Sequence, residues 1–208
     1  MEEDIIKEIV KRVMDTIDHR KTIPLEVSAR HVHLSQKHME KLFGANYIMS
    51  KKKELSQPGQ FQYKERVSLI GPKGVLRGVA ILGPPRERTQ VEISKTDSIS
   101  LGIKPPIRQS GDLDGSESLY ISTDNAVIKV VESVIIAKRH IHMTPEDAEK
   151  FNVRDNQRVS VRVNSERPVV FEDVVIRVSS KYKLNMHIDF DEGNAAGYQE
   201  DVVCEIVI

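Results

Sequence analysis

Apolar and polar residues alternate along most of this chain in short runs, and turns rich in proline or glycine separate the runs about every 8 to 12 residues. An alternation with a period of two places the apolar side chains on one face of a β-strand. Only short stretches have the period of a helix. Because short strands at this spacing are typical of barrels and sandwiches, the pattern predicts an all-β protein rather than a series of βαβ units.

Individual strands can be located from the apolar runs and the turns between them. Pro72 is well placed in a hairpin turn formed by residues 71–74. The polar stretch 51–60 (KKKELSQPGQ) is expected to be a loop, and residues 97–101 are expected to be a helical turn. The expected strands are residues 25–34, the hairpin 67–82, 89–93, two strands within 119–131, 133–143, 158–163, 169–178, 184–189 and 202–208.

Two longer helical segments are marked by residues that favour helix ends. Ser35 is suited to the N-cap of a helix that Gly44 stops. Thr144 is suited to the N-cap of another, with Pro145 at its first position and Asp147 three residues after the cap. Both helices are expected to follow a strand directly.

The N-terminal segment, residues 3–19, predicts an amphipathic helix. Two alternatives are open for it: packing on the body of the protein or on a second subunit, or docking into a larger assembly as a targeting helix. Its apolar rows at i, i+4 spacing are Ile5, Ile9, Val13 and Ile17, and next to them Ile6, Val10 and Met14.

One motif occurs twice, at an offset of 109 residues. The copies are Arg30-His31-Val32-His33-Leu34-Ser35 and Arg139-His140-Ile141-His142-Met143-Thr144. Side chains two apart on a strand point to the same face, so each copy presents two imidazoles side by side. The repeat indicates two related halves and a metal site. Two other histidines, His19 and His38, lie in polar helical segments and are expected to be solvated.

Composition narrows the class of protein. A chain of 208 residues suffices for one large domain or two of about 100 residues. The 31 basic and 31 acidic residues balance, so nothing favours nucleic-acid binding. Cys204 is the only cysteine, which excludes an intrachain disulfide and suggests core packing. No apolar run approaches the roughly 20 residues of a membrane span, and the acidic N-terminus is unlike a signal peptide, so we expect a cytoplasmic protein without membrane contact.

The histidines suit zinc, which in catalytic sites takes three protein ligands and keeps one open position. His140, His142 and a third histidine in an apolar run, His187, would form one such site. His31 and His33 need another ligand, for which a strand carboxylate such as Glu92 would serve, although a solvent-facing carboxylate is the simpler interpretation.

Arginine matches phosphate or an oxyanion through its bidentate fork, and Arg86 lies in a turn six residues before Glu92. Arg30 and Arg139 are expected to be structural, because adjacent strand positions point away from the histidines. Metal together with arginine indicates acyl or phosphoryl chemistry on an anionic substrate, and leaves open whether the enzyme is a hydrolase or a transferase.

Six separated motifs, in order, resemble those of the PduL-type phosphotransacylases (phosphate propanoyltransferases). The resemblance runs from about residue 22 to the C-terminus. The motifs are SARHVHLS at 28–35, KELSQPGQF at 53–61, GPPR at 83–86 with TQVE at 89–92, SGD at 110–112, RHIHM at 139–143 and MHID at 186–189.

The resemblance implies reversible acyl transfer, in which acyl-CoA and phosphate give acyl phosphate and CoA, at a site with two zinc ions. It implies that His31, His33 and Glu92 bind one zinc and that His140, His142 and His187 bind the other. Arg86 would hold the phosphate or the developing oxyanion, and Ser110 would orient the substrate. The CoA contacts are unassigned, with Lys51–Lys53 as candidates for its phosphates.

The resemblance also implies two β-barrels capped by short helices, and a homodimer. Residues 21–29 and 138–208 would form one barrel, residues 30–137 the other with an excursion at about 44–64, and residues 1–20 the helix. Members of the family that work in bacterial microcompartments, as in propanediol degradation, often carry such a helix as an encapsulation signal. The cytoplasm is therefore the expected location and a microcompartment lumen the alternative, with shell or core proteins as partners.

Overall fold

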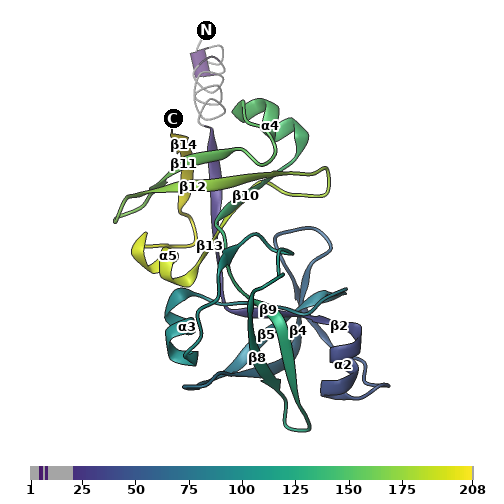
Figure 1. The fold of residues 1–208 in the computed structure, drawn as a ribbon. Helices are drawn as coiled ribbons and strands as arrows, with labels where there is room; N and C mark the ends of the chain where they lie inside the picture. Colours follow the sequence, from purple (N-terminus) through teal and green to yellow (C-terminus); the bar gives the residue numbers. More distant parts are fainter. Residues whose placement is uncertain (1–4, 7, 9–20, 208) are drawn as a thin grey trace.

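A computed structural model of the chain describes residues 5, 6, 8 and 21–207, so most of the helix predicted over residues 3–19 lies outside the described residues. Strands dominate the described part, and short helices connect some of them (Figure 1). The prediction of a mainly β protein is therefore confirmed. Within the described residues, no helix has both the length and the apolar character that crossing a membrane requires.

One closed barrel combines the first strand of the chain with the C-terminal strands. Its order is β1-β13-β10-β12-β11-β14. Buried apolar side chains such as Ile23, Ile141 and Ile176 fill its interior. The six strands are β1 (Thr22–Ser28), β10 (His140–Met143), β11 (Arg158–Asn164), β12 (Val169–Val178), β13 (Asn185–Asp189) and β14 (Val203–Val207).

The middle of the chain forms a second sheet of eight strands around a core of its own, which includes Val32, Ile81 and Ile121. β8 pairs with both β4 and β9, so β4, β5, β2, β6, β9 and β8 pair in a ring. The eight strands are β2 (His31–Ser35), β3 (Lys51–Glu54), β4 (Phe61–Ile70), β5 (Val75–Arg86), β6 (Gln90–Glu92), β7 (Ile107–Arg108), β8 (Glu117–Ser122) and β9 (Val127–Ala137).

The two rings have the same pattern of strand pairing. Each strand with the repeated motif has one parallel and one antiparallel neighbour: β5 and β6 beside β2, and β12 and β13 beside β10. β1 pairs parallel with β13, as β9 pairs parallel with β6. The first strand of the chain thus occupies in one ring the place that β9 occupies in the other.

The helices begin where short-range hydrogen bonds define their ends. The Ser35 hydroxyl accepts a hydrogen bond from the His38 N–H at the start of α2 (Gln36–Phe43), and Gly44 ends it with φ of 106°, which glycine adopts readily. Thr144 and Asp147 form a capping box before α4 (Pro145–Phe151). Both predicted caps are confirmed.

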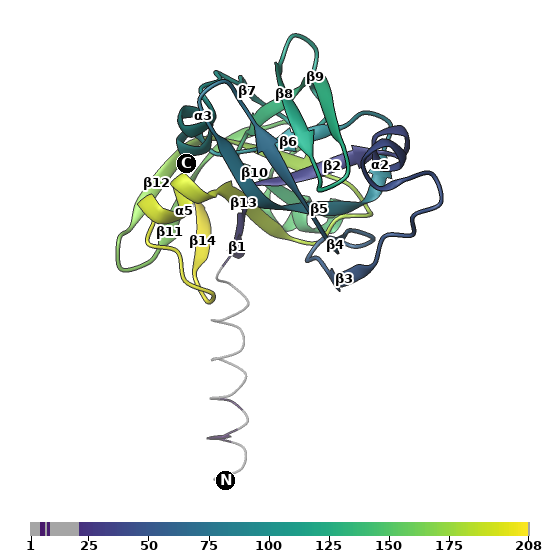
Figure 2. The same ribbon diagram turned by 90° about the horizontal axis from the view of Figure 1, so that it is seen from below.

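Two further short helices each follow the strand that pairs antiparallel with the motif strand. α3 (Lys95–Leu101) follows β6, and α5 (Phe190–Ala195) follows β13. They lie next to each other (Figures 1 and 2), and the Thr96 N–H donates to Asp191 Oδ2 at 2.8 Å. The helical turn expected over residues 97–101 corresponds to α3, which begins two residues earlier, whereas the sequence interpretation proposed no element in place of α5. A helix as short as α5 does not show a helical period.

Several element boundaries differ from the predictions. Arg86, for example, was expected in a turn and is the last residue of β5. The predicted strand 25–34 is interrupted between Ser28 and His31, so that β1 and β2 belong to different sheets. The predicted strand 133–143 divides in the same way into β9 and β10. The predicted loop 51–60 begins with β3, which pairs with β4 and leaves its side chains exposed. An exposed edge strand has no apolar face, and hence no alternation to reveal it.

Candidate active site

A cavity of about 440 Å³ is lined by residues of both rings. All the residues selected from the sequence line it, although the chain separates the first from the last by more than 150 positions. They are His31, His33, Arg86, Glu92, Ser110, His140, His142 and His187.

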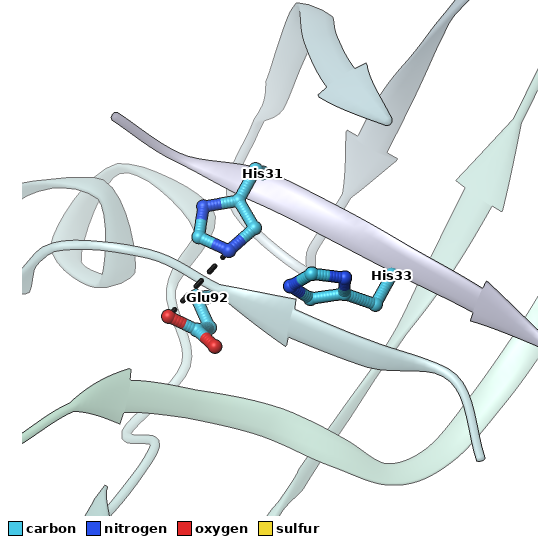
Figure 3. A group of neighbouring side chains, drawn as sticks. All are labelled: His31, His33 and Glu92. Atoms are coloured by element: carbon cyan, nitrogen blue, oxygen red, sulfur yellow. Dashed lines mark ion pairs between the residues drawn. The ribbon is translucent and has the colours of Figure 1, made fainter. Parts of the chain in front are cut away.

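The first group of ligand candidates is His31, His33 and Glu92, here called the first trio (Figure 3). β2 and β6 are antiparallel, and their register places His31 directly opposite Glu92. The ligand atoms of the three side chains lie within 4.8 Å of one another. His31 Nε2 is 3.5 Å from Glu92 Oε2, and its Nδ1 lies 2.8 Å from the Ala29 carbonyl oxygen. With the proton on Nδ1, the ring presents its Nε2 lone pair to the trio.

Charges within the first trio act on one another. Burial alone would raise the pKa of Glu92, but the charge and hydrogen bond of His31 hold it well below its usual range. Burial alone would lower the pKa of His31, and the Glu92 carboxylate outweighs it, so the pKa of His31 is raised. Burial, followed by the neighbouring His31, lowers the pKa of His33. A buried carboxylate that stays ionised among imidazoles is an arrangement suited to a cation.

The second group, His140, His142 and His187, is here called the second trio. β10 and β13 are antiparallel, and His140 lies opposite His187. The ring centroids are 4.6 to 5.3 Å apart. His140 Nδ1 lies 2.8 Å from the Lys138 carbonyl oxygen, which repeats the contact of His31. The ligand atoms of the second trio are farther apart than those of the first trio. Among the described residues, only the first trio brings three such ligand atoms within 4.8 Å of one another.

The second trio is held in the neutral form that binds metals. Burial lowers the pKa of His140 and of His187 to about 4. Burial, then the neighbouring His140 and His187, lowers the pKa of His142 to about 2. At neutral pH these rings therefore keep their lone pairs. Among the described residues, the buried Nδ1 atoms of His33 and His142 have no hydrogen-bond partner.

A hydrogen-bond network joins Arg86 and Ser110 to the first trio. Arg86 Nη1 donates to the Ser110 hydroxyl oxygen at 2.9 Å, and Gln90 Nε2 donates to the same oxygen at 2.8 Å. Gln90 Nε2 also donates to Glu92 Oε1, while its own oxygen accepts the Gly111 N–H at 2.8 Å. Because both lone pairs of the Ser110 oxygen are used, its proton is free to be donated into the cavity.

Gln90 was missed by the sequence interpretation, as were residues around the second trio. Arg177 and Tyr182 also line the cavity, and Arg177 Nη2 donates to the Tyr182 hydroxyl at 3.2 Å. The Tyr182 ring lies 4.2 Å from that of His142, centroid to centroid. The signal for Arg177 in the sequence was a charged residue within the apolar run of β12. In the structure its register position lies beside His142.

The segment after β3 contacts the closed barrel. Gln57 Nε2 donates to the Lys183 carbonyl oxygen at 2.9 Å, and the Lys183 N–H donates to Gln57 Oε1 at 3.2 Å. The Ser56 hydroxyl donates to Glu26. Gln57 is buried and lines the cavity, together with Lys53 at the end of the lysine run. This segment therefore forms one wall of the cavity.

Two other predictions concern histidines outside the cavity. His38 was expected to be solvated, but it is only half exposed, and its Nδ1 lies 2.7 Å from the Thr89 hydroxyl oxygen. Because α2 packs against the second sheet, its polar face is not entirely free of contacts. His19 lies outside the described residues.

Comparison with known proteins gives one consistent result. The phosphate propanoyltransferase family model matches residues 24–199. A phosphate propanoyltransferase of Alkaliphilus metalliredigens is 57% identical over 96% of this chain and 96% of its own length. One of Clostridioides difficile is 51% identical over 99% of this chain and 98% of its own length. One of Thermotoga maritima is 47% identical over 93% and 92%, respectively.

Proposed function

The chain belongs to the phosphate propanoyltransferase family and is an acyltransferase enzyme. We propose that it transfers a short acyl group directly between CoA and inorganic phosphate, at a site for two zinc ions. One observation carries the proposal: two groups of three ligand side chains, one from each ring, line a single cavity with Arg86. The division into domains of residues 21–29 with 138–208, and of residues 30–137, is part of the same proposal.

The donor atoms of both trios fit zinc. Imidazole nitrogen and carboxylate oxygen are common zinc ligands, and three protein ligands leave one position open for a substrate. The backbone contacts of His31 and His140 fix the ring tautomer in the way that partners of ligating histidines do. The unpartnered Nδ1 atoms of His33 and His142 fit side chains that lack a ligand. When bound, the two ions would supply Lewis-acid charge for the oxygens of phosphate and thioester.

Arg86 and Ser110 provide hydrogen-bond donors for an anionic substrate. The Arg86 guanidinium is half-buried, and burial lowers its pKa, yet it stays protonated and carries a positive charge into the cavity. Ser110 orients it through one hydrogen bond and keeps its own proton for a substrate oxygen. Donors fixed before the substrate arrives stabilise charge that develops on the phosphate or on the thioester carbonyl.

Direct attack of phosphate on the thioester is supported by the location of the only cysteine. Cys204 is buried in the core of the closed barrel, where burial raises the pKa of its thiol to about 12. A thiol nucleophile is therefore excluded, and thiolate is a good enough leaving group to need no covalent intermediate. Direct transfer can be tested by the exchange of labelled CoA into acyl-CoA in the absence of phosphate. Such exchange requires an acyl-enzyme, so observing it would contradict direct transfer.

The rival function is a dizinc hydrolase of thioesters, in which water replaces phosphate. Release of CoA from acetyl-CoA should depend strictly on phosphate if the chain is a transferase. Release at the same rate without phosphate supports the hydrolase. Kinetics with acetyl-, propanoyl- and butanoyl-CoA on metal-replete protein then establish the preferred acyl chain, with propanoyl as the expectation from the names of the relatives.

The proposal for location and assembly rests on the family resemblance. We propose a homodimer that works in the cytoplasm, with encapsulation in a bacterial microcompartment as the alternative if residues 1–20 act as a targeting helix. Deleting residues 1–20 should leave acyl transfer unchanged. Loss of co-assembly with shell proteins in this deletion variant would indicate a targeting helix. A lower mass than that of the full chain by light scattering, from dimer to monomer, would indicate a helix that packs in the dimer.

A further inference from the structure

The arginine that begins each copy of the repeated motif forms an ion pair with a carboxylate on the helix that follows the antiparallel strand of the same trio. Arg30 contacts Asp97 of α3, and Arg139 contacts Glu192 of α5. The spacing is the same in both copies: the arginine immediately precedes the first histidine of the trio, and the carboxylate comes five residues after the third ligand. A repeated spacing on both sides of the cavity suggests a shared role.

The first copy is the tighter of the two. Arg30 Nε donates to Asp97 Oδ2 at 3.0 Å, and its Nη2 lies 2.8 Å from Oδ1, so the pair is bidentate. The Asp97 side chain is 4% exposed. It also accepts the Ser94 N–H at 3.3 Å in the capping box of α3. Ser94 follows Glu92 by two residues, so this contact connects Arg30 to the segment that carries the third ligand.

The second copy has one contact and an aromatic support. Arg139 Nη1 lies 3.2 Å from Glu192 Oε1. Its guanidinium carbon lies 5.1 Å from the centroid of the Phe171 ring. Glu192 accepts the Asp189 N–H at 3.1 Å in the capping box of α5, and Asp189 follows His187 by two residues. The same chain of contacts therefore leads from the arginine to the third ligand.

Each arginine also adjoins the carbonyl group that orients the first histidine. The acceptor of the His31 ring is the carbonyl of Ala29, and the acceptor of the His140 ring is the carbonyl of Lys138. In both copies the arginine is the residue between acceptor and histidine. The ion pair fixes the arginine side chain to the helix that follows the neighbouring strand. It therefore restricts the movement of the peptide group that presents this carbonyl.

We propose that Arg30 and Arg139 are positioning residues, each of which holds the first and third ligands of its own trio in place for zinc. This inference rests on the proposed two-zinc site. It differs from a general contribution to stability. The exposed Arg158 allows the comparison, because it lies 3.0 Å from Asp173 and reaches the second trio only indirectly, through the ion pair of Asp173 with Lys138. Partners that orient metal ligands are worth about 10- to 100-fold in metal affinity.

The experiment measures zinc affinity of the full chain by competition with a chromophoric chelator. The His140→Ala background leaves only the first trio, and the His31→Ala background leaves only the second. Arg30→Gln should weaken zinc binding by about 10-fold or more in the first background and leave it unchanged in the second. Arg139→Gln should give the reverse. Arg158→Gln removes an arginine–carboxylate pair but leaves the Lys138–Asp173 pair in place, so it serves as the control and should change neither.

Lysine substitutions test the geometry and replace any glutamine variant that fails to fold. Lysine keeps the charge but lacks the fork, so Arg30→Lys should remain weakened, whereas Arg139→Lys should recover most of the affinity. Equal losses in both backgrounds, with a lower melting temperature, would show a merely structural role and overturn the inference. Unchanged affinity in all variants overturns it as well. A wild-type chain that binds no zinc instead overturns the proposed two-zinc function on which the inference rests.

Discussion

The two rings place the same pair of histidines in the same sheet register but surround the pair with different side chains. Opposite the first histidine stands Glu92 in one ring and His187 in the other. Opposite the second stands Gln90 or Asn185. The first trio therefore carries one negative charge and the second carries none. A repeated scaffold thus supplies two candidate ligand sites of unequal charge, and the side chain opposite the first histidine decides the difference.

The parallel neighbours of the motif strands extend this contrast. Leu82 of β5 stands beside His33, whereas Arg177 of β12 stands beside His142. On the first trio's side Arg86 is balanced by the Glu92 carboxylate, whereas the second trio has no carboxylate to balance Arg177. Since phosphate and the phosphates of CoA are anionic, we expect the second trio's side of the cavity to attract them more strongly.

The largest expected effect comes from removing one trio at a time. In His31→Ala or His140→Ala, kcat/KM for acyl transfer should fall by more than about 100-fold, since loss of a partner that only orients a ligand already costs about 10- to 100-fold. Zinc content by mass spectrometry should fall from two ions to one. A variant that loses one zinc and keeps its activity would show that the two rings do not act together.

A smaller effect is expected when the third ligands are made alike. Glu92→His would give the first ring the ligand set of the second, so zinc binding should persist. We expect kcat/KM to fall by about 10-fold, because the trio loses its charge and Gln90 loses an acceptor. His187→Glu is the converse control. Wild-type kinetics in Glu92→His would mean that the charge difference between the rings has no role.

The two register-equivalent amides give a further comparison. Gln90 uses both its amide nitrogen and its oxygen in hydrogen bonds, so Gln90→Ala leaves buried groups unpaired at a cost of about 1 to 3 kcal/mol in the free energy of unfolding. Asn185 donates to Glu26 at 2.9 Å, and its oxygen has no partner within the described part of the chain. Asn185→Ala should therefore cost less. Urea unfolding and kcat/KM of both variants would check this order, and equal losses would contradict it.

The smallest effect concerns Cys204. It lies opposite Ile23 and Val163, as Ile121 in the other ring lies opposite Ile128 and Leu69, so the thiol occupies a core position. Burial raises the pKa of the thiol to about 12. The folded-state pKa exceeds the value of about 9 in the unfolded chain. The contribution of the buried, protonated thiol to the free energy of unfolding is therefore complete below pH 9 and is lost between pH 9 and 12.

Labelling with an aromatic disulfide reagent at pH 8 tests whether the Cys204 thiol is buried and protonated. It should be slow in the native protein and rapid after denaturation, because the thiolate is the reactive form. Rapid labelling of the native chain would show that the thiol is accessible and ionised, and would reopen the question of a cysteine nucleophile.

Features that depend on a few neighbouring residues could be predicted from the sequence. The caps at Ser35 and Thr144 rest on hydrogen bonds to residues three positions away, and both were located correctly. The hairpin turn before Val75 is similarly local. The repeated motif identified the strands of the site for the same reason, since the alternation within six residues already places both imidazoles on one face.

Features that depend on which strands become neighbours were decided only by the tertiary structure. The apolar positions change phase there, from Leu25 and Val27 to Val32 and Leu34, but a change of phase alone does not show that the chain leaves one ring and enters the other. Gln57 and Gln90 have no distinctive neighbours in the sequence, and the apolar run around Arg177 does not show which strand lies beside it. They reach the cavity through sheet register and, for Gln57, a long-range contact with Lys183. The sequence by itself determined the types of the candidate ligands and their pairing along each strand. The closure of each trio required the antiparallel register that sets Glu92 against His31 and His187 against His140, because hydrogen bonding between distant strands fixes that register and adjacent residues do not.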